Sequence, residues 1–105
     1  MPKYLIQSSY TTAGFEGVRS QGGSSRRAAT EETLKSLGGA LESFYFSFGD
    51  HDVHIVVDLP DNEAAAAAAL AVGATGALAC KTTVLLTPEE VDEAAERSVA
   101  YTPPG

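Results

Sequence analysis

The residues best suited to chemistry lie in one segment near the middle of the chain. Residues 41–61 read LESFYFSFGDHDVHIVVDLPD and contain both histidines, His51 and His54, with Asp52 between them. On a β-strand Asp52 and His54 share a face, and a hairpin places Tyr45 opposite His54. A histidine held by a carboxylate can act as a base near neutral pH. We therefore take His54, Tyr45 and Asp52 as candidate catalytic groups for proton transfer.

Structural roles compete with each of these assignments. Asp52, at a hairpin end, can accept backbone N–H bonds. His54 can be a partly buried histidine bonded to Tyr45 or to a dimer partner. If strand geometry holds at His51, its side chain points to the face opposite His54. His51, Asp52 and His54 then cannot bind one metal ion together. We expect no metal and no cofactor.

A second candidate site is the segment 21–27, QGGSSRR. Its glycines, hydroxyls and guanidinium groups at a helix start are the ingredients of an anion cradle. The spacing matches no phosphate-binding loop, so a surface loop with an N-cap serine is the competing interpretation. Ser24, Arg26 and Arg27, together with His51, are the candidate ligand-binding residues. We expect the single cysteine, Cys80, to be an inert small residue, because no histidine lies near it in the sequence.

A hairpin must position the histidine segment. Gly49-Asp50 predicts a two-residue turn with Gly49 at positive φ. The register then places Phe48 opposite His51 and Tyr45 opposite His54. Because side chains alternate along a strand, one face of the hairpin is apolar and is formed by Phe44, Phe46, Phe48, Val53, Ile55 and Val57. The opposite, polar face carries Ser43, Tyr45, Ser47, Asp52, His54 and Asp58.

The remaining elements follow from alternation and from helix start and stop signals. Residues 3–10 form a first strand, and Thr11-Thr12 caps a short helix to about residue 20. Ser24 or Ser25 caps a helix over 26–37 that Gly38-Gly39 ends. Asp61 opens an alanine-dense helix to about residue 76, and a fourth strand covers 81–87. A capping box at 87–90 starts a last helix that ends near residue 98.

The predicted order is β-α-β-β-α-β with a C-terminal helix. It indicates an α+β, ferredoxin-like fold: a four-stranded antiparallel sheet with helices on one face. The other face is half apolar around Val56, and we expect Tyr4, Tyr10 and Tyr45 to line it. Covering that face with a second sheet removes its apolar area from water, so we expect a homodimer or a higher even oligomer.

Composition limits the classes of function. The chain has 105 residues, 44% hydrophobic and 20% charged, which predicts one globular domain over residues 1–105. Its net charge of −7 makes it acidic and argues against nucleic acid and anionic membranes as partners. No secretory signal or bilayer-spanning segment is evident, and a single cysteine fits a reducing compartment. We expect a cytoplasmic protein.

The ordered set of short motifs resembles the GYD-domain family. The resemblance rests on GDHD at 49–52 between FYFSF and VHIVVDLPD, on Arg26, on Gly38-Gly39, and on the Thr-Pro-Glu-Glu helix start. Family members are small bacterial proteins of the dimeric α+β barrel group. They usually carry a tyrosine where this chain has His51, so any role of that phenol does not carry over. The resemblance implies a fold and a dimer, and no particular reaction.

Three hypotheses of function follow. The first, which we favour, is a homodimer that binds a small molecule or a protein partner without catalysis. The second is a cofactor-independent enzyme that uses His54, Tyr45 and Asp52, because dimeric α+β barrels host oxygenases and isomerases. The third is a metal-binding protein, which the lack of a further cluster of histidines disfavours.

Overall fold

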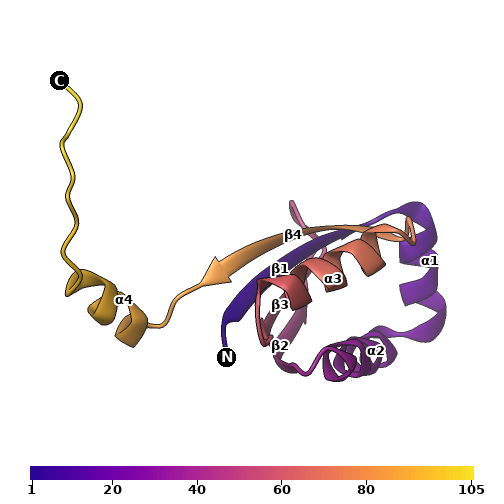
Figure 1. The fold of residues 1–105 in the computed structure, drawn as a ribbon. Helices are drawn as coiled ribbons and strands as arrows, with labels where there is room; N and C mark the ends of the chain where they lie inside the picture. Colours follow the sequence, from indigo (N-terminus) through magenta and orange to yellow (C-terminus); the bar gives the residue numbers. More distant parts are fainter.

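The computed structural model describes residues 1–105 as a four-stranded sheet with helices over one face and an arm that leaves the body at the C-terminal end (Figure 1). The elements in chain order are β1 (Lys3–Tyr10), α1 (Thr12–Gln21), α2 (Gly23–Ser36), β2 (Ala40–Phe46), β3 (Val53–Asp58), α3 (Asn62–Gly73), β4 (Leu78–Leu85) and α4 (Pro88–Ala95). The strands lie in the order β2-β3-β1-β4, and every neighbouring pair is antiparallel. The predicted ferredoxin-like α+β fold is confirmed.

The hydrophobic core lies between the sheet and its helices. Alternation along β1 buries Tyr4 and Ile6, and alternation along β3 buries Val53, Ile55 and Val57. Leu34 of α2 and Ala65 of α3 belong to the same buried cluster. The residues between them in the strands face the other side of the sheet, which no helix covers.

Side chains cap three of the four helices as the sequence predicts. Thr11 accepts from the Gly14 N–H at the start of α1, and Asp61 accepts from the Ala64 N–H at the start of α3. Thr87 and Glu90 form a complete capping box on α4. Backbone bonds to the Glu90 carboxylate lower its pKa.

The start of α2 differs from the prediction. The helix begins at Gly23, and its N-cap is Gly22, which has φ of +88° and provides no side-chain cap. Ser24 and Ser25 therefore lie within the first turn and not ahead of it. The predicted end of the helix is confirmed: Gly38 adopts φ of +76°, and the Gly39 N–H donates to the Leu34 carbonyl.

The β2–β3 hairpin follows the predicted register only within its strands. Tyr45 pairs with His54 and Phe46 with Val53, as expected. Pairing stops there, and residues 47–52 form a longer loop in place of the predicted two-residue turn. The Ser47 N–H donates to the Asp52 carbonyl (2.8 Å) and closes this loop. Gly49 does not have positive φ and Phe48 has no partner in the strand register, so the predicted tight turn and the predicted pairing of Phe48 with His51 are both wrong.

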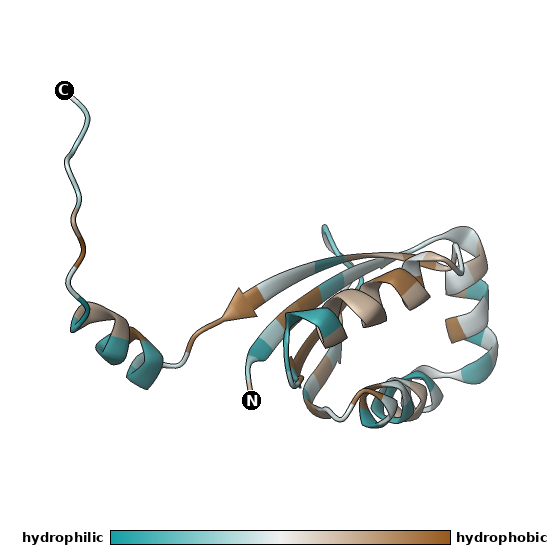
Figure 2. Cartoon of the chain, in the orientation of Figure 1, coloured by the Kyte–Doolittle hydropathy of each residue, from teal (hydrophilic) through white to brown (hydrophobic).

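The C-terminal arm begins where β4 ends. The strand starts at Leu78, three residues before the prediction, and its last residues lead into a strongly hydrophobic stretch (Figure 2). Helix α4 contains no buried residue, and the tail beyond it runs away from the body (Figure 1). The molecule consequently extends over 54 × 34 × 22 Å. None of its helices combines the length and the apolar character needed to cross a bilayer.

Candidate functional site

The three candidate proton-transfer residues do not converge on one site. Tyr45 lies opposite His54 in the register, but no hydrogen bond joins them, and Tyr45 is 70% exposed. His54 instead bonds the Ser47 hydroxyl through Nε2 (3.0 Å) and the Gln7 side-chain amide through Nδ1 (3.5 Å). Because the Ser47 hydroxyl already donates to the His51 carbonyl, the tautomer of His54 with its proton on Nε2 satisfies this network.

A local irregularity at Asp52 reverses the faces predicted for two site residues: His51 lies on the open face with His54, and Asp52 lies on the helix side. The Asp52 N–H donates to the Ser8 carbonyl, while Val53 is the register partner of Ser8. Two residues thus oppose one, the arrangement of a β-bulge. His51 therefore lies beside His54, with ring centroids 6.1 Å apart, and its Nδ1 lies 3.4 Å from the Ser9 hydroxyl. The expectation that His51 faces away from His54 is wrong.

Asp52 has the backbone role that the sequence suggested for it. Its carboxylate accepts the Tyr10 N–H at 2.9 Å and ties the hairpin end to β1. It also lines a shallow groove with Phe15 and Phe48, on the helix side of the sheet. No three His, Cys, Asp or Glu side chains of the chain come together in an arrangement that could hold a metal ion.

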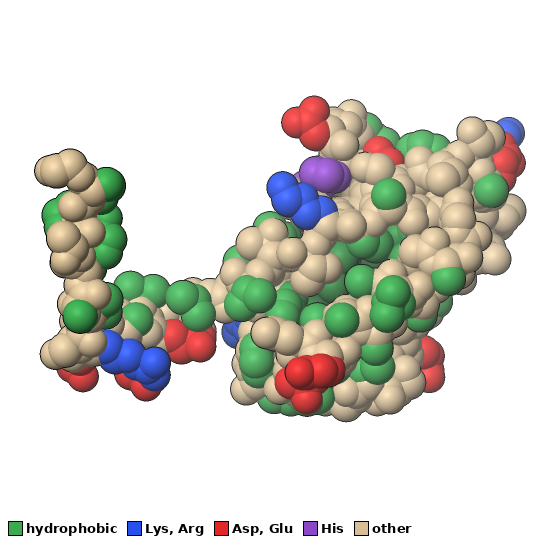
Figure 3. Space-filling model, turned by 45° about the horizontal axis from the view of Figure 1, so that its top comes forward, with side chains coloured by type: hydrophobic (Ala, Val, Ile, Leu, Met, Phe, Trp, Pro, Cys, Tyr) green, Lys and Arg blue, Asp and Glu red, His purple; other side chains and the backbone are tan.

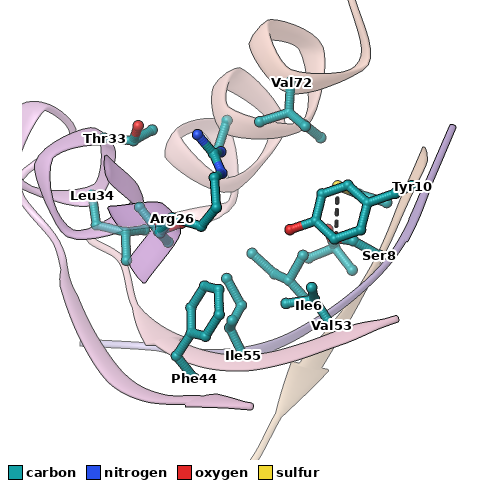
Figure 4. A pocket seen from close by; sticks show the side chains of 15 residues that line it. Ile6, Ser8, Tyr10, Arg26, Thr33, Leu34, Phe44, Val53, Ile55 and Val72 are labelled. Atoms are coloured by element: carbon teal, nitrogen blue, oxygen red, sulfur yellow. Dashed lines mark hydrogen bonds between the residues drawn. The ribbon is translucent and has the colours of Figure 1, made fainter. Parts of the chain in front are cut away.

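A cavity of about 110 Å³ lies on the helix side of the sheet, between the strands, α2 and α3. Figure 4 shows side chains from these elements around it, and Figure 3 shows hydrophobic side chains lining a hollow in the body. Short side chains leave this space, because Thr30 and Thr33 on α2 face Ala68 and Ala69 on α3 across it. The apolar part of its lining is formed by Ile6, Leu34, Phe44, Val53, Ile55, Ala68, Ala69 and Val72.

Few polar groups reach this cavity. The Arg26 guanidinium extends from α2 and the Tyr10 hydroxyl from β1, and both point into the space (Figure 4). On the sheet, the Ser8 hydroxyl and the Cys80 thiol lie 3.1 Å apart in a hydrogen bond. Burial raises the pKa of Tyr10, and the positive charge of Arg26 beside it offsets part of that shift. The phenol is therefore protonated at neutral pH and can donate a hydrogen bond.

The structure separates the predicted ligand-binding residues. Only Arg26 lines the cavity, whereas Ser24 and Arg27 line a shallow groove between α2 and β2. His51 lies at the hairpin tip near the open face of the sheet. Successive helical residues point about 100° apart, so Arg26 and Arg27 face different sides of α2.

The fold and the order of its elements agree with a family comparison. The GYD domain matches residues 4–95, from the first strand to the end of α4. The chain belongs to the GYD-domain family. No curated protein matches the sequence of this GYD domain.

Sequence reasoning recognised Arg26 as a binding residue of this GYD domain but placed two tyrosines of β1 on the wrong face of the sheet. Tyr10 and Tyr4 were expected on the open face, but both lie on the helix side. Tyr4 is buried and donates from its hydroxyl to the Asn62 side-chain oxygen at 2.7 Å. The alternation of β1 was the available signal, since Tyr4, Ile6 and Ser8 share one face and Tyr10 follows in the same step.

Proposed function

We propose that this GYD domain is a homodimeric binding protein that holds a small molecule in the cavity between its sheet and its helices. The observation that carries the proposal is the apolar cavity with Arg26 and Tyr10 pointing into it. Ligand sites in proteins are concave and mostly apolar, with a few polar groups that fix the orientation of the ligand. A single Cys80, hydrogen-bonded to Ser8, supports a reducing, cytoplasmic setting.

The size of the cavity sets the size of the ligand. An apolar cavity of about 150 Å³ is known to hold benzene, so a space of this order holds a group the size of one ring. The volume of about 110 Å³ therefore supports a ligand with one ring or a short branched chain. A neutral one-ring compound such as benzyl alcohol is a suitable first probe.

Cavity binding can be tested by filling the space. Ala68 is buried on the cavity side of α3, whereas Ala66 of the same helix is exposed. We expect ligand-observed NMR to detect benzyl alcohol on the wild-type protein and on Ala66→Leu. We expect Ala68→Leu to weaken that binding severalfold while the protein remains folded. Absence of binding to the wild-type protein, or equal binding by both variants, would refute the cavity as the site.

The open face of the sheet supports the homodimer. Leu5 and Val56 are cross-strand partners there, and no helix of the chain covers them. The arm adds exposed apolar side chains at Leu86, Val91 and Val99. Figure 3 shows hydrophobic side chains along the arm. A second copy placed on this face would remove such area from water, and specific interfaces bury about 800 Å² per partner.

A matched pair of valine substitutions tests the dimer. Val56 lies on the open face, whereas Val84 is the partner of Tyr4 and lies on the helix side at the sheet edge. We expect Val56→Arg to give a monomer mass by light scattering at micromolar concentration, and Val84→Arg to keep the dimer mass. A monomeric wild-type protein would contradict the proposal.

The alternative is a cofactor-independent enzyme. It finds limited support in His54, whose ring is oriented by Gln7 and Ser47 as a base requires. Asp52 and Tyr45, however, form no hydrogen bond with it. Under our proposal His54→Gln and His51→Gln both bind benzyl alcohol as the wild-type protein does. Loss of binding in either variant would move the site to the open face.

A further inference from the structure

Arg26 is the only charged residue among those that line the cavity. It is partly buried, and no carboxylate of the chain forms an ion pair with it, whereas Lys3, Arg19 and Arg97 all have acidic partners. The other cations without an acidic partner, Arg27, Lys35 and Lys81, are exposed to water, so Arg26 is the one unpaired cation that is partly buried. A guanidinium withdrawn from water without a counter-charge favours an anion that can supply one.

Tyr10 adds a donor beside this charge. Its protonated phenol and the Arg26 guanidinium can both donate to the oxygens of one anionic group. The sheet side of the cavity offers only neutral donors, because one hydrogen of the bonded Ser8–Cys80 pair and the Thr82 hydroxyl carry no charge. The anionic end of a ligand is therefore directed toward Arg26 and Tyr10, and its apolar end toward the core.

The position of these two residues suits a charged group. Arg26, Tyr10 and Val72 line both the cavity and a shallower groove that opens between α1 and the start of β4. The anion at this junction keeps part of its hydration, so its transfer from water costs less than full burial would. The apolar body of the ligand then occupies the interior against Ile6 and Leu34.

The charge balance selects the kind of anion. One guanidinium faces the space, and no second cation lies in its lining. A carboxylate carries a single negative charge and matches the planar guanidinium through two parallel bonds. A phosphate monoester carries about 1.5 to 2 negative charges at neutral pH and would be left undercompensated among apolar walls.

We propose that the ligand of this GYD domain is a small carboxylic acid with an apolar body the size of one ring, its carboxylate bound by Arg26 and Tyr10. This inference rests on the proposed function, since it requires that the cavity bind a ligand. It adds the chemical class of that ligand and the residue that discriminates it from neutral compounds of the same shape.

The test compares two probes of similar size at pH 7, benzoate and benzyl alcohol, by NMR titration of the full-length protein. We expect the wild-type protein to bind benzoate about tenfold more tightly, because charge-assisted hydrogen bonds are the stronger ones. Arg26→Gln should remove this preference, because it weakens benzoate binding much more than benzyl alcohol binding. Arg26→Lys should restore part of it, because the charge returns without the planar pair of donors.

Arg27→Gln is the matched control, because the neighbouring arginine is exposed and lines only the outer grooves of α2. It should bind both probes as the wild-type protein does. If benzyl alcohol binds as tightly as benzoate, or if Arg26→Gln keeps the preference, the ligand class is wrong while cavity binding stands. If neither probe binds the wild-type protein, the proposed function fails together with this inference.

Discussion

The two faces of the sheet are built from alternate residues of the same strands, yet they have opposite characters. On the helix side Tyr4 is 1% exposed and Val57 is fully buried. One residue away in the sequence, Leu5 and Val56 are only partly covered by their neighbours in the sheet. The covered face contains the core and the cavity, and the open face contains the histidines. The covering helices, and not residue type alone, thus determine which side chains become a core, a binding site or an interface.

The largest difference between the faces should appear when one large side chain is removed from each. We expect Tyr4→Ala to lower the free energy of unfolding by about 3–5 kcal/mol, because it empties a fully packed site. Leu5→Ala should cost less than about 1 kcal/mol in the Val56→Arg background, where no second copy covers it. Urea denaturation measures both values. Equal losses would mean that the open face is also covered in the monomer.

Substitution of two glycines compares the tightly packed helix side of the sheet with the exposed hairpin tip. A Cβ on Gly39 would lie 2.3 Å from the Asp58 carbonyl oxygen, where the layer of α2 meets the end of β3. A Cβ on Gly49, at the hairpin tip, would meet nothing within 4 Å. We expect Gly39→Ala to cost about 1–3 kcal/mol of stability and Gly49→Ala to stay within about 0.5 kcal/mol of the wild-type protein. Thermal melts of the two variants decide this, and a large loss in Gly49→Ala would restore the tight turn that the sequence suggested.

The smallest expected difference between the two faces is in the stability that each loses at alkaline pH. Burial raises the pKa of Tyr10 on the helix side above its usual 10.0, and hydrogen bonds from Lys3 to Asp58 and Glu42 raise the pKa of Lys3 on the open face above 10.5. A group with a raised folded-state pKa contributes stability that is complete below its unfolded pKa and is lost as the pH rises through the folded value.

Melting temperatures between pH 8 and pH 12 should therefore fall at the alkaline end, and two variants separate the contributions. The decrease in melting temperature with pH should be smaller in Tyr10→Phe than in the wild-type protein, and it should also be smaller in Lys3→Met. The Lys3 contribution should also shrink at high salt, because its side chain and its partners are accessible to water. An unchanged profile in both variants would show that neither group contributes to the alkaline loss.

Much of the fold could be predicted from the sequence because its signals are local. The alternation of β3 predicted its buried face, and Thr11, Asp61 and Thr87 marked three helix starts, whereas Tyr4 and Tyr10 of β1 were assigned to the wrong face. The hairpin tip could not be predicted, because a bulge at Asp52 depends on a bond to Ser8 in another strand. The start of α2 was also misplaced, because Gly22 starts it without a side-chain cap.

The candidate site was harder to predict than the fold. A cavity has no sequence signal of its own, because it is the space that several short side chains fail to fill. Here Thr30, Thr33 and Ala68 come from two helices that are far apart along the chain. Arg26 was recognised by its residue type, but its partner Tyr10 was placed on the wrong face. The sequence favoured the histidines of the hairpin as site residues. In the structure their ring nitrogens are hydrogen-bonded to Ser47, Ser9 and Gln7, which are neighbours within the same sheet.

The central position of β1 has a consequence for synthesis of the protein. Strand β1 is made first, but both of its neighbours, β3 and β4, come later in the chain. At about 5–20 residues per second, several seconds pass on a ribosome before β4 emerges and can pair with it. During that time one edge of a strand with two future partners stays open, and unpaired strand edges promote aggregation. The sheet, and with it the floor of the cavity at Ser8 and Cys80, can therefore be completed only after β4 has left the ribosome.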